Sequence, residues 1–273
     1  MRRSLVVAIV VAVLLCGLGV GGWFAYQYVY QRVTPEVCTV QTDDGYITLT
    51  APQARNASTI VGASLERGLP EQAAVIALAT AWQESGLRNL DYGDRDSLGL
   101  FQQRPSYGWG TPEEILDPWY SANRFYEELV KFDNWDTIDV NDIAQKVQRS
   151  GHPEAYRKHE TNARALAGAL RGSREAALAC LTFDRPPAAP EELTRLLASF
   201  GDAATPAWEG TTLSVSTVDA PTAWAVAQHL VANTYGAGVT EVTVADRQWR
   251  AGSKGWAEAR EPVGDAEVRA TLG

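Results

Sequence analysis

The chain of 273 residues carries 33 acidic and 24 basic residues, giving a formal net charge of −9, and 45% of its residues are hydrophobic. This length is enough for two modest domains, and the composition excludes a wholly disordered or multi-span membrane protein. Binding to nucleic acid requires a concentrated basic surface, and no basic run occurs beyond the extreme N-terminus. The bulk numbers therefore indicate a globular protein without a nucleic-acid partner.

The N-terminal segment has the pattern of a membrane anchor. Arg2 and Arg3 precede a stretch, residues 5–26, without a charged residue, and about 20 apolar residues span a bilayer as a helix. A cleaved signal peptide has a shorter apolar core, and bulky residues before Cys16 disfavour a lipoprotein, although both remain alternatives. The sequence predicts a transmembrane helix within residues 1–30 and, by the positive-inside rule, a single-pass cell-membrane protein whose C-terminal portion is extracytoplasmic.

Beyond this segment the chain contains two cysteines, Cys38 and Cys180. One pair of cysteines in an oxidising compartment predicts a disulfide that closes a long loop. The chain-entropy model credits such a loop with roughly 4–5 kcal/mol of stability. Two unrelated buried thiols are the alternative.

Helix signals come in close succession after a short stalk, residues 31–49. Capping residues, prolines and glycines predict helices over residues 50–68, 70–86, 111–116, 117–132, 139–151 and 153–172. A proline-rich linker and short helix follow over residues 182–209, and then strands (211–218, 239–244, 267–272) and a helix (221–233) alternate. The predicted architecture is a mainly α domain, residues 50–181, followed by a small α/β domain, residues 210–273.

Glu84 has the properties expected of a general acid. It lies at the C-terminal end of the most hydrophobic predicted helix. Desolvation there disfavours the ionised carboxylate, and the negative end of the helix dipole acts in the same direction. Both effects would raise its pKa toward the range in which a general acid works. Helix-end glutamates are common, however, so this position alone also fits a structural role.

The residues around Glu84 carry a motif. Glu84-Ser85 at a helix end is followed by Gly99-Leu100-Phe101-Gln102 and then Arg104-Pro105. Over residues 50–170 this pattern resembles the soluble lytic transglycosylases and goose-type lysozymes, which have a lysozyme-like fold. The resemblance implies cleavage of the β-1,4 bond between N-acetylmuramic acid and N-acetylglucosamine in peptidoglycan, without a cofactor. One carboxylate suffices for a transglycosylase, because the 6-hydroxyl group of the sugar attacks; hydrolysis normally requires a second carboxylate.

The resemblance also suggests roles for neighbouring residues. Glu84 is the expected catalytic residue, Gln102 would bind a sugar or brace its loop, and Phe101 would pack beneath the site. Substrate-binding candidates are Ser85, Phe101, Gln102, Tyr107, Gln148 and Tyr156, and Trp109 and Trp119 are further aromatic candidates that would serve equally well in the core. Asp91, Asp94 and Asp96 are candidates for a second carboxylate, with loop capping as their alternative role.

The second motif of the family departs from its usual form. Ala-Tyr-Asn-Ala-Gly is reduced to Val147-Gln148-Arg149-Ser150-Gly151, so the tyrosine that would approach Glu84 is missing there. Either Gln148 replaces it, or Tyr156 reaches in from the next element. This departure favours a second reading, a non-catalytic peptidoglycan-binding or cell-envelope assembly protein, whereas the intact Glu84 disfavours it.

No metal site is expected, because His152, His159 and His229 lack partners at the spacing of metal ligands. The C-terminal unit resembles a small accessory domain appended to bacterial wall hydrolases and distantly related to D,D-peptidases. It lacks the final His-x-His that holds zinc in those peptidases, since the last strand contains Val268-Arg269-Ala270-Thr271. We interpret it as a non-catalytic module, and the expected partner of the whole chain is the peptidoglycan glycan strand.

Overall fold

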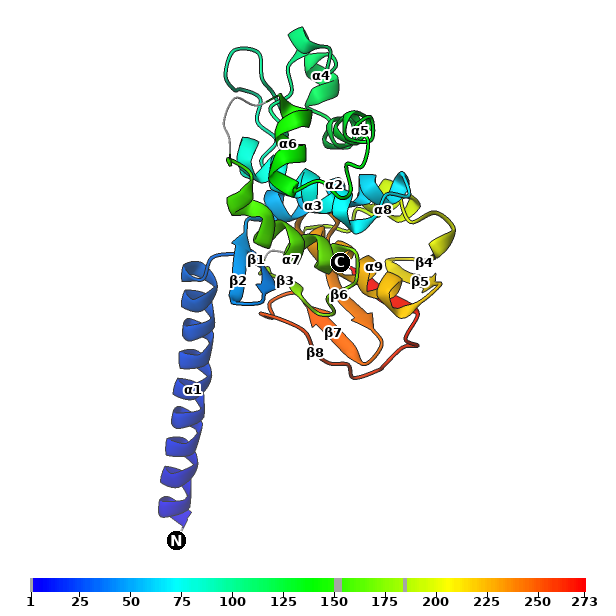
Figure 1. Ribbon diagram of the computed structural model, residues 1–273. Coiled ribbons are helices and arrows are strands. Elements are labelled where there is room, and N and C mark those ends of the chain that lie inside the picture. The colour runs from blue at the N-terminus through cyan, green and yellow to red at the C-terminus, as the bar shows by residue number, and fades with distance from the viewer. Residues whose placement is uncertain (1, 150–153, 184–185) are drawn as a thin grey trace. The chain divides into compact units, whose positions relative to one another are not determined.

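The computed structural model describes residues 2–149, 154–183 and 186–273 (Figure 1). The chain divides into two units, residues 1–36 and residues 37–273. About 48% of the chain is helical and 19% is strand, in two antiparallel sheets. The expectation of a mainly α domain followed by a small α/β domain is therefore wrong. Residues read as a stalk pair as strands, and the C-terminal strands form a sheet larger than the sequence indicated.

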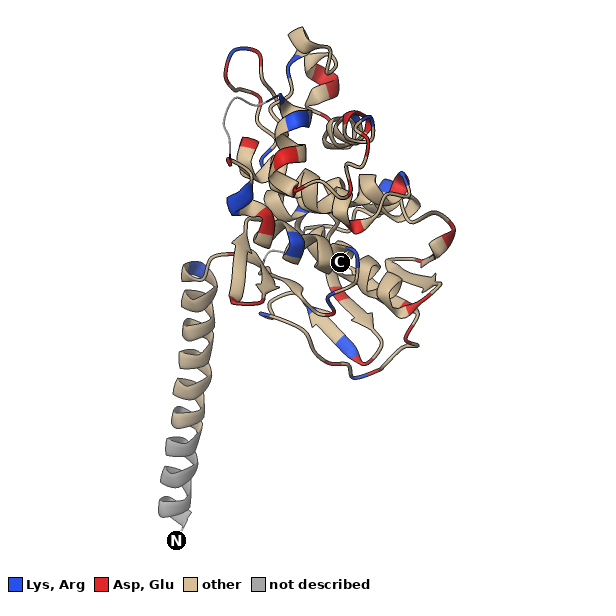
Figure 2. Ribbon diagram, in the orientation of Figure 1, with Lys and Arg blue, Asp and Glu red and all other residues tan. Residues whose placement is uncertain are grey.

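The first unit consists of helix α1, Arg2–Val33. In the part of the chain that the structure describes, no helix is both long and apolar enough to cross a membrane. This finding contradicts the predicted transmembrane helix, the signal anchor and the single-pass membrane location. Figure 2 shows no charged residue in the described part of α1 before its last turn, which contains Arg32. Over residues 17–31, however, the apolar character of the helix is interrupted. Glycines there have no apolar side chain, and the tyrosines and glutamines carry polar groups.

The second unit contains all other elements. Its helices are α2 (Ala51–Glu66), α3 (Glu71–Ser85), α4 (Pro112–Ile115), α5 (Pro118–Leu129), α6 (Val140–Gln148), α7 (Glu160–Leu170), α8 (Glu191–Ala198), α9 (Ala220–Ala232) and α10 (Thr234–Ala237). Short 3-10 helices are η1 (Pro105–Tyr107), η2 (Arg157–His159) and η3 (Gly201–Ala203). Its strands are β1 (Val37–Thr42), β2 (Gly45–Leu49), β3 (Leu178–Leu181), β4 (Ala204–Glu209), β5 (Thr212–Thr217), β6 (Val239–Val244), β7 (Arg247–Arg250), β8 (Ala257–Glu258) and β9 (Glu267–Leu272).

A small antiparallel sheet of order β2-β1-β3 joins the start of this unit to its middle. Cys38 on β1 lies directly opposite Cys180 on β3, and the two buried residues form a disulfide. The predicted disulfide is confirmed. Because it closes a loop of 142 residues, it removes much of the conformational freedom of the unfolded chain.

Helix α3 is the central helix of the α-helical layer, as its nearly uniform apolar composition predicted. It is buried along residues 73–81 and packs against α2, α5, α6 and α7. A helix that is apolar on all sides is stable only when other elements cover all of its faces. Gly86 ends α3 in a left-handed conformation with φ 63°, which glycine adopts without steric cost. The end of α3 therefore has a fixed position.

The C-terminal strands form a six-stranded antiparallel sheet of order β4-β5-β9-β6-β7-β8. Helix α9 packs against β5, β6 and β9 of this sheet and also against α2, α7 and β3 (Figure 1). The side chain of Gln228 on α9 is fully buried, accepts the N–H of Leu178 and donates to the carbonyls of Ala169 and Arg174. The C-terminal sheet and the helical layer therefore share one core.

Candidate active site

Glu84 is held at the end of α3, where α2 fixes the turn that follows. The side chain of Gln53 donates to the carbonyl of Gly86 at 2.8 Å, and that of Asn56 donates to the carbonyl of Leu87 at 2.8 Å. These bonds satisfy carbonyl groups that the end of a helix leaves unpaired. Glu84 itself is partly buried and faces a cavity.

The hydroxyl group of Tyr156 donates a hydrogen bond of 2.6 Å to Oε1 of Glu84. Tyr156 is only 1% exposed, and its backbone N–H donates to the side chain of Asn141, which is itself buried at the start of α6. Of the two alternatives raised by the sequence, Tyr156 is therefore the residue that contacts Glu84. Asn141 was not expected to matter, and no sequence signal distinguishes it from an ordinary residue in the first turn of a helix.

Gln148, the last residue of α6, has a different structural role. Its Nε2 donates to the backbone carbonyl of Phe101 at 2.7 Å. Phe101 is fully buried and stacks on Phe125 with ring centroids 4.7 Å apart. Gln148 thus connects the end of α6 to the loop after α3 and lines the cavity beside Glu84.

The loop after α3 is a compact hairpin. Backbone hydrogen bonds join Leu98 and Gln103 in both directions, and Gly99 donates to Leu90. Gly99 has φ +77°, and a Cβ there would lie 2.7 Å from the carbonyl oxygen of Ile115. Only glycine fits this position without displacing the backbone. Ser85 fastens the hairpin to α3, because its buried hydroxyl donates to the carbonyl of Leu100 at 2.8 Å. The structure therefore gives Ser85 a positioning role.

Gln102 braces its own loop, one of the two roles expected for it. Its Nε2 lies 3.3 Å from the carbonyl oxygens of Tyr92 and Gly99. Its Oε1 occupies the space that a Cβ at Gly93 would need. Gln102 also has φ +48°, an uncommon conformation for a residue other than glycine and one that occurs at functional sites. The sequence placed Gly93 and Gln102 in the same loop, and the structure adds that the two residues are in close contact.

The cavity beside Glu84 has a volume of about 660 Å³. It is lined by Glu84, Asp94, Arg95, Ser97, Gln102, Arg104, Tyr107, Trp109, Gln148 and Arg149. Three of these residues are arginines and two are acidic, so the lining has a net positive charge, although the chain as a whole carries −9. A volume in this range suits small-molecule sites, which span roughly 300–1,000 Å³.

Two aromatic side chains line this cavity. Tyr107 is 57% exposed, with the guanidinium of Arg104 over its ring at 4.3 Å. Trp109 lines the same cavity and has Arg124 at 5.7 Å from its ring centroid. Exposed aromatic rings are suitable surfaces for stacking on sugar rings. The other expected aromatic, Trp119, does not line this cavity.

The three candidate second carboxylates differ in their surroundings. Asp96 accepts hydrogen bonds from the backbone of Ser106 and from Arg104, at 2.9 and 2.6 Å. These interactions, with Ser106 the larger contributor, hold the pKa of Asp96 well below its usual range, so it caps the loop. Asp91 is exposed and does not line the cavity. Asp94 lines it together with Glu84 and is the remaining candidate.

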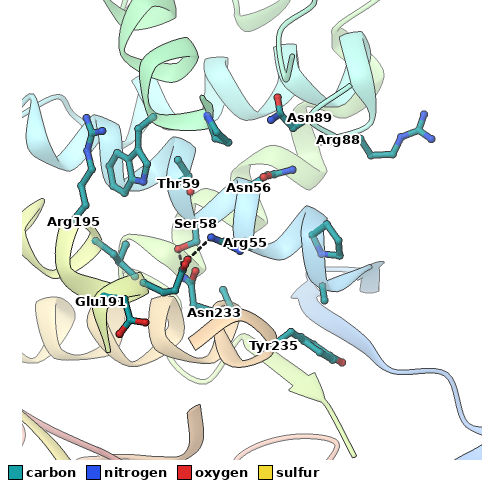
Figure 3. Close-up of a pocket in the computed structure, with 18 residues that line it drawn as sticks. Arg55, Asn56, Ser58, Thr59, Arg88, Asn89, Glu191, Arg195, Asn233 and Tyr235 are labelled. Carbon is teal, nitrogen blue, oxygen red and sulfur yellow. Dashed lines mark hydrogen bonds and ion pairs between the residues drawn. The ribbon is translucent and has the colours of Figure 1, made fainter. Parts of the chain in front are cut away.

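A larger cavity of about 800 Å³ lies between α2, α8 and the end of α9 (Figure 3). Many of its polar groups already have partners. Arg55 pairs with Glu192 at 2.5 Å, and Arg195 lies over the ring of Trp119 at 4.7 Å. Trp119 is therefore part of this wall and not of the Glu84 site.

At the inner end of this cavity the structure brings together Ser58 and His229, a contact that the sequence did not indicate. Oγ of Ser58 lies 2.7 Å from Nδ1 of His229 and accepts from Nδ2 of Asn233 at 2.9 Å. Burial lowers the pKa of His229 to about 3. An imidazole with so low a pKa is a poor general base near neutral pH, and we assign this cluster a structural role.

No group of three or more His, Cys, Asp or Glu side chains within the described ranges could hold a metal ion. His152, one of the three histidines considered from the sequence, lies outside the described residues. His159 stacks on Trp82 with ring centroids 6.1 Å apart, and burial lowers its pKa.

Comparison of the chain with protein-family models gives no match, and comparison with curated proteins gives none either. The features that bear on function are the Tyr156–Glu84 hydrogen bond and the cavity that Glu84 lines together with the loop after α3.

Proposed function

We propose that the chain is a peptidoglycan glycosidase of the lytic-transglycosylase or muramidase type. In this proposal it cleaves the β-1,4 bond between N-acetylmuramic acid and N-acetylglucosamine, and Glu84 is the general acid. The observation that carries the proposal is a hydrogen bond of 2.6 Å from the buried Tyr156 hydroxyl to Glu84, a partly buried glutamate that lines a cavity of about 660 Å³.

The chemistry follows from this pair. Protonation of the glycosidic oxygen by Glu84 leaves a carboxylate behind, and the Tyr156 hydroxyl is placed to donate a hydrogen bond to that carboxylate. A donor aimed at charge that develops during the reaction stabilises the transition state more than the ground state. As the bond from C1 to the leaving oxygen breaks, the 6-hydroxyl oxygen of the muramic acid sugar bonds to C1 and its proton passes to the Glu84 carboxylate, which restores the acid. Attack by water in place of this hydroxyl would involve a second carboxylate as well.

The substitution Glu84→Gln tests the assignment. The amide has nearly the same shape but cannot donate a proton to the leaving oxygen, so cleavage of purified peptidoglycan should fall by about 100- to 10,000-fold while the protein remains folded. The matched control is Glu113→Gln, which makes the same chemical change at an exposed position of α4. It should retain full activity in the same zymogram.

Retention of more than a few percent of activity in Glu84→Gln would contradict the general-acid role. Mass spectrometry of the released fragments distinguishes the two reaction types, because anhydro ends result from transglycosylation and reducing ends from hydrolysis. Hydrolysis would require a second carboxylate, and Asp94, an exposed residue, is the other acidic residue among those that line the cavity.

A non-catalytic peptidoglycan-binding protein is the second candidate. The observation that favours it is that the side chain of Gln102 is engaged with Tyr92 and Gly99 of its own loop. Wild-type protein that binds peptidoglycan, but cleaves it no faster than Glu84→Gln does, would select this candidate.

A further inference from the structure

A third cavity, of about 310 Å³, lies where the turn after α2, the end of α7, η3 and the start of α9 meet. It shares no lining residue with the Glu84 cavity. Its wall is about equally polar and apolar, and its larger apolar side chains are Leu65, Leu69 and Phe200. Its one charged lining residue is Arg171.

Arg171 is unusual among the arginines of the chain. It is partly buried at the C-terminal end of α7, and its Nη1 donates to Oγ of Ser64 at 3.3 Å. None of the ion pairs among the described residues involves it. Burial lowers the pKa of Arg171, whereas carboxylate partners raise the pKa of Arg104 and Arg157. The guanidinium is therefore partly shielded from water and forms no ion pair among the described residues, although the charge of Glu71 acts on it from a distance.

Such an arrangement is costly, because a charge that is removed from water needs a compensating partner. The negative end of the α7 dipole supplies a part of this compensation. A guanidinium also has five N–H donors in a fixed fork that matches a carboxylate. The carboxylate of Asp219, which caps α9 beside the cavity, accepts the N–H of Thr222 and forms no ion pair with Arg171.

The backbone segments around the cavity are closely packed. Gly172 follows Arg171 with φ +79°, and a Cβ there would overlap the carbonyl oxygen of Pro221 in the first turn of α9. This contact brings Thr222 and Ala225 of α9 to the cavity wall, which Leu65 also lines. The position of the guanidinium relative to the apolar wall is therefore set by packed backbone and not by an exposed loop.

We propose that this cavity binds a small carboxylate whose apolar body is short, with the carboxylate on Arg171 and the body against Leu65, Leu69 and Phe200. A short aliphatic acid and the C-terminus of a peptide that ends in small residues share this chemistry. The site is distinct from the proposed active site, and the inference does not rest on the glycosidase function.

Titration of the full chain with three probes tests the proposal: butyrate, acetyl-alanyl-alanine and the C-terminal amide of acetyl-alanyl-alanine. Binding is measured by calorimetry and by the shift of Tm at millimolar concentrations. The carboxylates should bind and raise Tm, and the amide should not. Tighter binding of butyrate identifies a free aliphatic acid as the ligand type, and tighter binding of the dipeptide identifies a peptide C-terminus.

The substitution Arg171→Met keeps most of the side-chain volume and removes the charge. It should weaken carboxylate binding by about 10- to 100-fold, the range expected for the loss of a hydrogen bond to a charged group. Arg260→Met, at an exposed position, is the matched control and should bind as the wild type does. Glu84→Gln should also bind normally, which separates this inference from the proposed activity.

A second variant, Ala203→Phe, fills the cavity from η3 and leaves Arg171 in place. It should abolish binding even if Arg171→Met fails to fold. Absence of carboxylate binding by the wild type, or equal binding by the wild type and Ala203→Phe, would overturn the proposal.

Discussion

At the scale of single residues, the Glu84–Tyr156 pair is the most informative contact in the molecule. Glu84 was predicted because a helix end and a motif coincide at that position. Tyr156 lies 72 residues further along the chain, and the sequence offered it only as an alternative to Gln148. The pairing exists because Asn141 holds the backbone of Tyr156 and α6 packs against α3.

The substitution Tyr156→Phe isolates the hydroxyl group. The phenyl ring still fills the buried site, but the hydrogen bond to Glu84 is lost. We expect kcat for peptidoglycan cleavage to fall by about 100-fold, comparable to the removal of one donor from an oxyanion site, with little change in KM. Tyr46→Phe, on β2 and 73% exposed, is the matched control. Unchanged kcat in Tyr156→Phe would remove this tyrosine from the mechanism.

At the scale of elements, glycines decide how closely neighbouring segments approach. Gly99 allows the hairpin after α3 to pass the carbonyl of Ile115, and Gly172 allows the first turn of α9 to pack on the end of α7. The sequence placed Gly99 in the motif after Glu84 and Gly172 at the end of a predicted helix. It did not indicate which backbone would lie against each of them, because that partner is distant in the sequence.

The substitution Gly172→Ala should therefore be strongly destabilising. A left-handed conformation costs a residue with a Cβ about 1–2 kcal/mol, and overlap with the Pro221 carbonyl adds to this cost. Urea denaturation should show a lower midpoint than for the wild type. Gly210→Ala is the control: it has φ +61° but open space around the added methyl group. A loss of stability no larger than that of the control would show that α9 can shift to accommodate the methyl group.

At the scale of the whole molecule, the helical layer and the C-terminal sheet are joined by buried polar groups on α9. His229 is fully buried against Ser58 of α2, and burial lowers its pKa from 6.5 to about 3. Between these values the unfolded chain binds a proton at His229 that the folded chain does not bind. The free energy of unfolding must therefore fall as the pH falls below about 6.5.

The slope expected from this one histidine is about 1.4 kcal/mol per pH unit. From pH 6.5 to pH 5 the wild type should lose roughly 2 kcal/mol more stability than His229→Asn, which has no titrating group at this position. Burial of His159 contributes in the same direction, but it is present in both proteins. Urea denaturation at several pH values measures both slopes, and equal slopes would show that His229 does not link folding to pH.

The sequence by itself determined the local features of this protein. Capping residues and prolines located the starts of the helices, and the apolar pattern identified α3 as the central helix. Glu84 and Gln102 were identified through a motif, and Cys38 and Cys180 through their number. These features depend on neighbours in the chain or on the number of cysteines. In the structure the two cysteines are joined, and Glu84 and Gln102 line the same cavity.

Only the tertiary structure decided what depends on distant contacts. The residues read as a stalk became β1 and β2 because β3, more than 130 residues later, supplies the hydrogen-bonding partner of β1. The apolar N-terminal run was read as a membrane anchor, and no helix in the described residues meets that requirement. Packing between helices brought Tyr156 to Glu84 and left Arg171 outside the ion pairs of the described residues. The pattern of apolar and polar residues in the sequence indicates which residues are buried. It does not identify the residue that each of them contacts, because that residue comes close only when the chain folds.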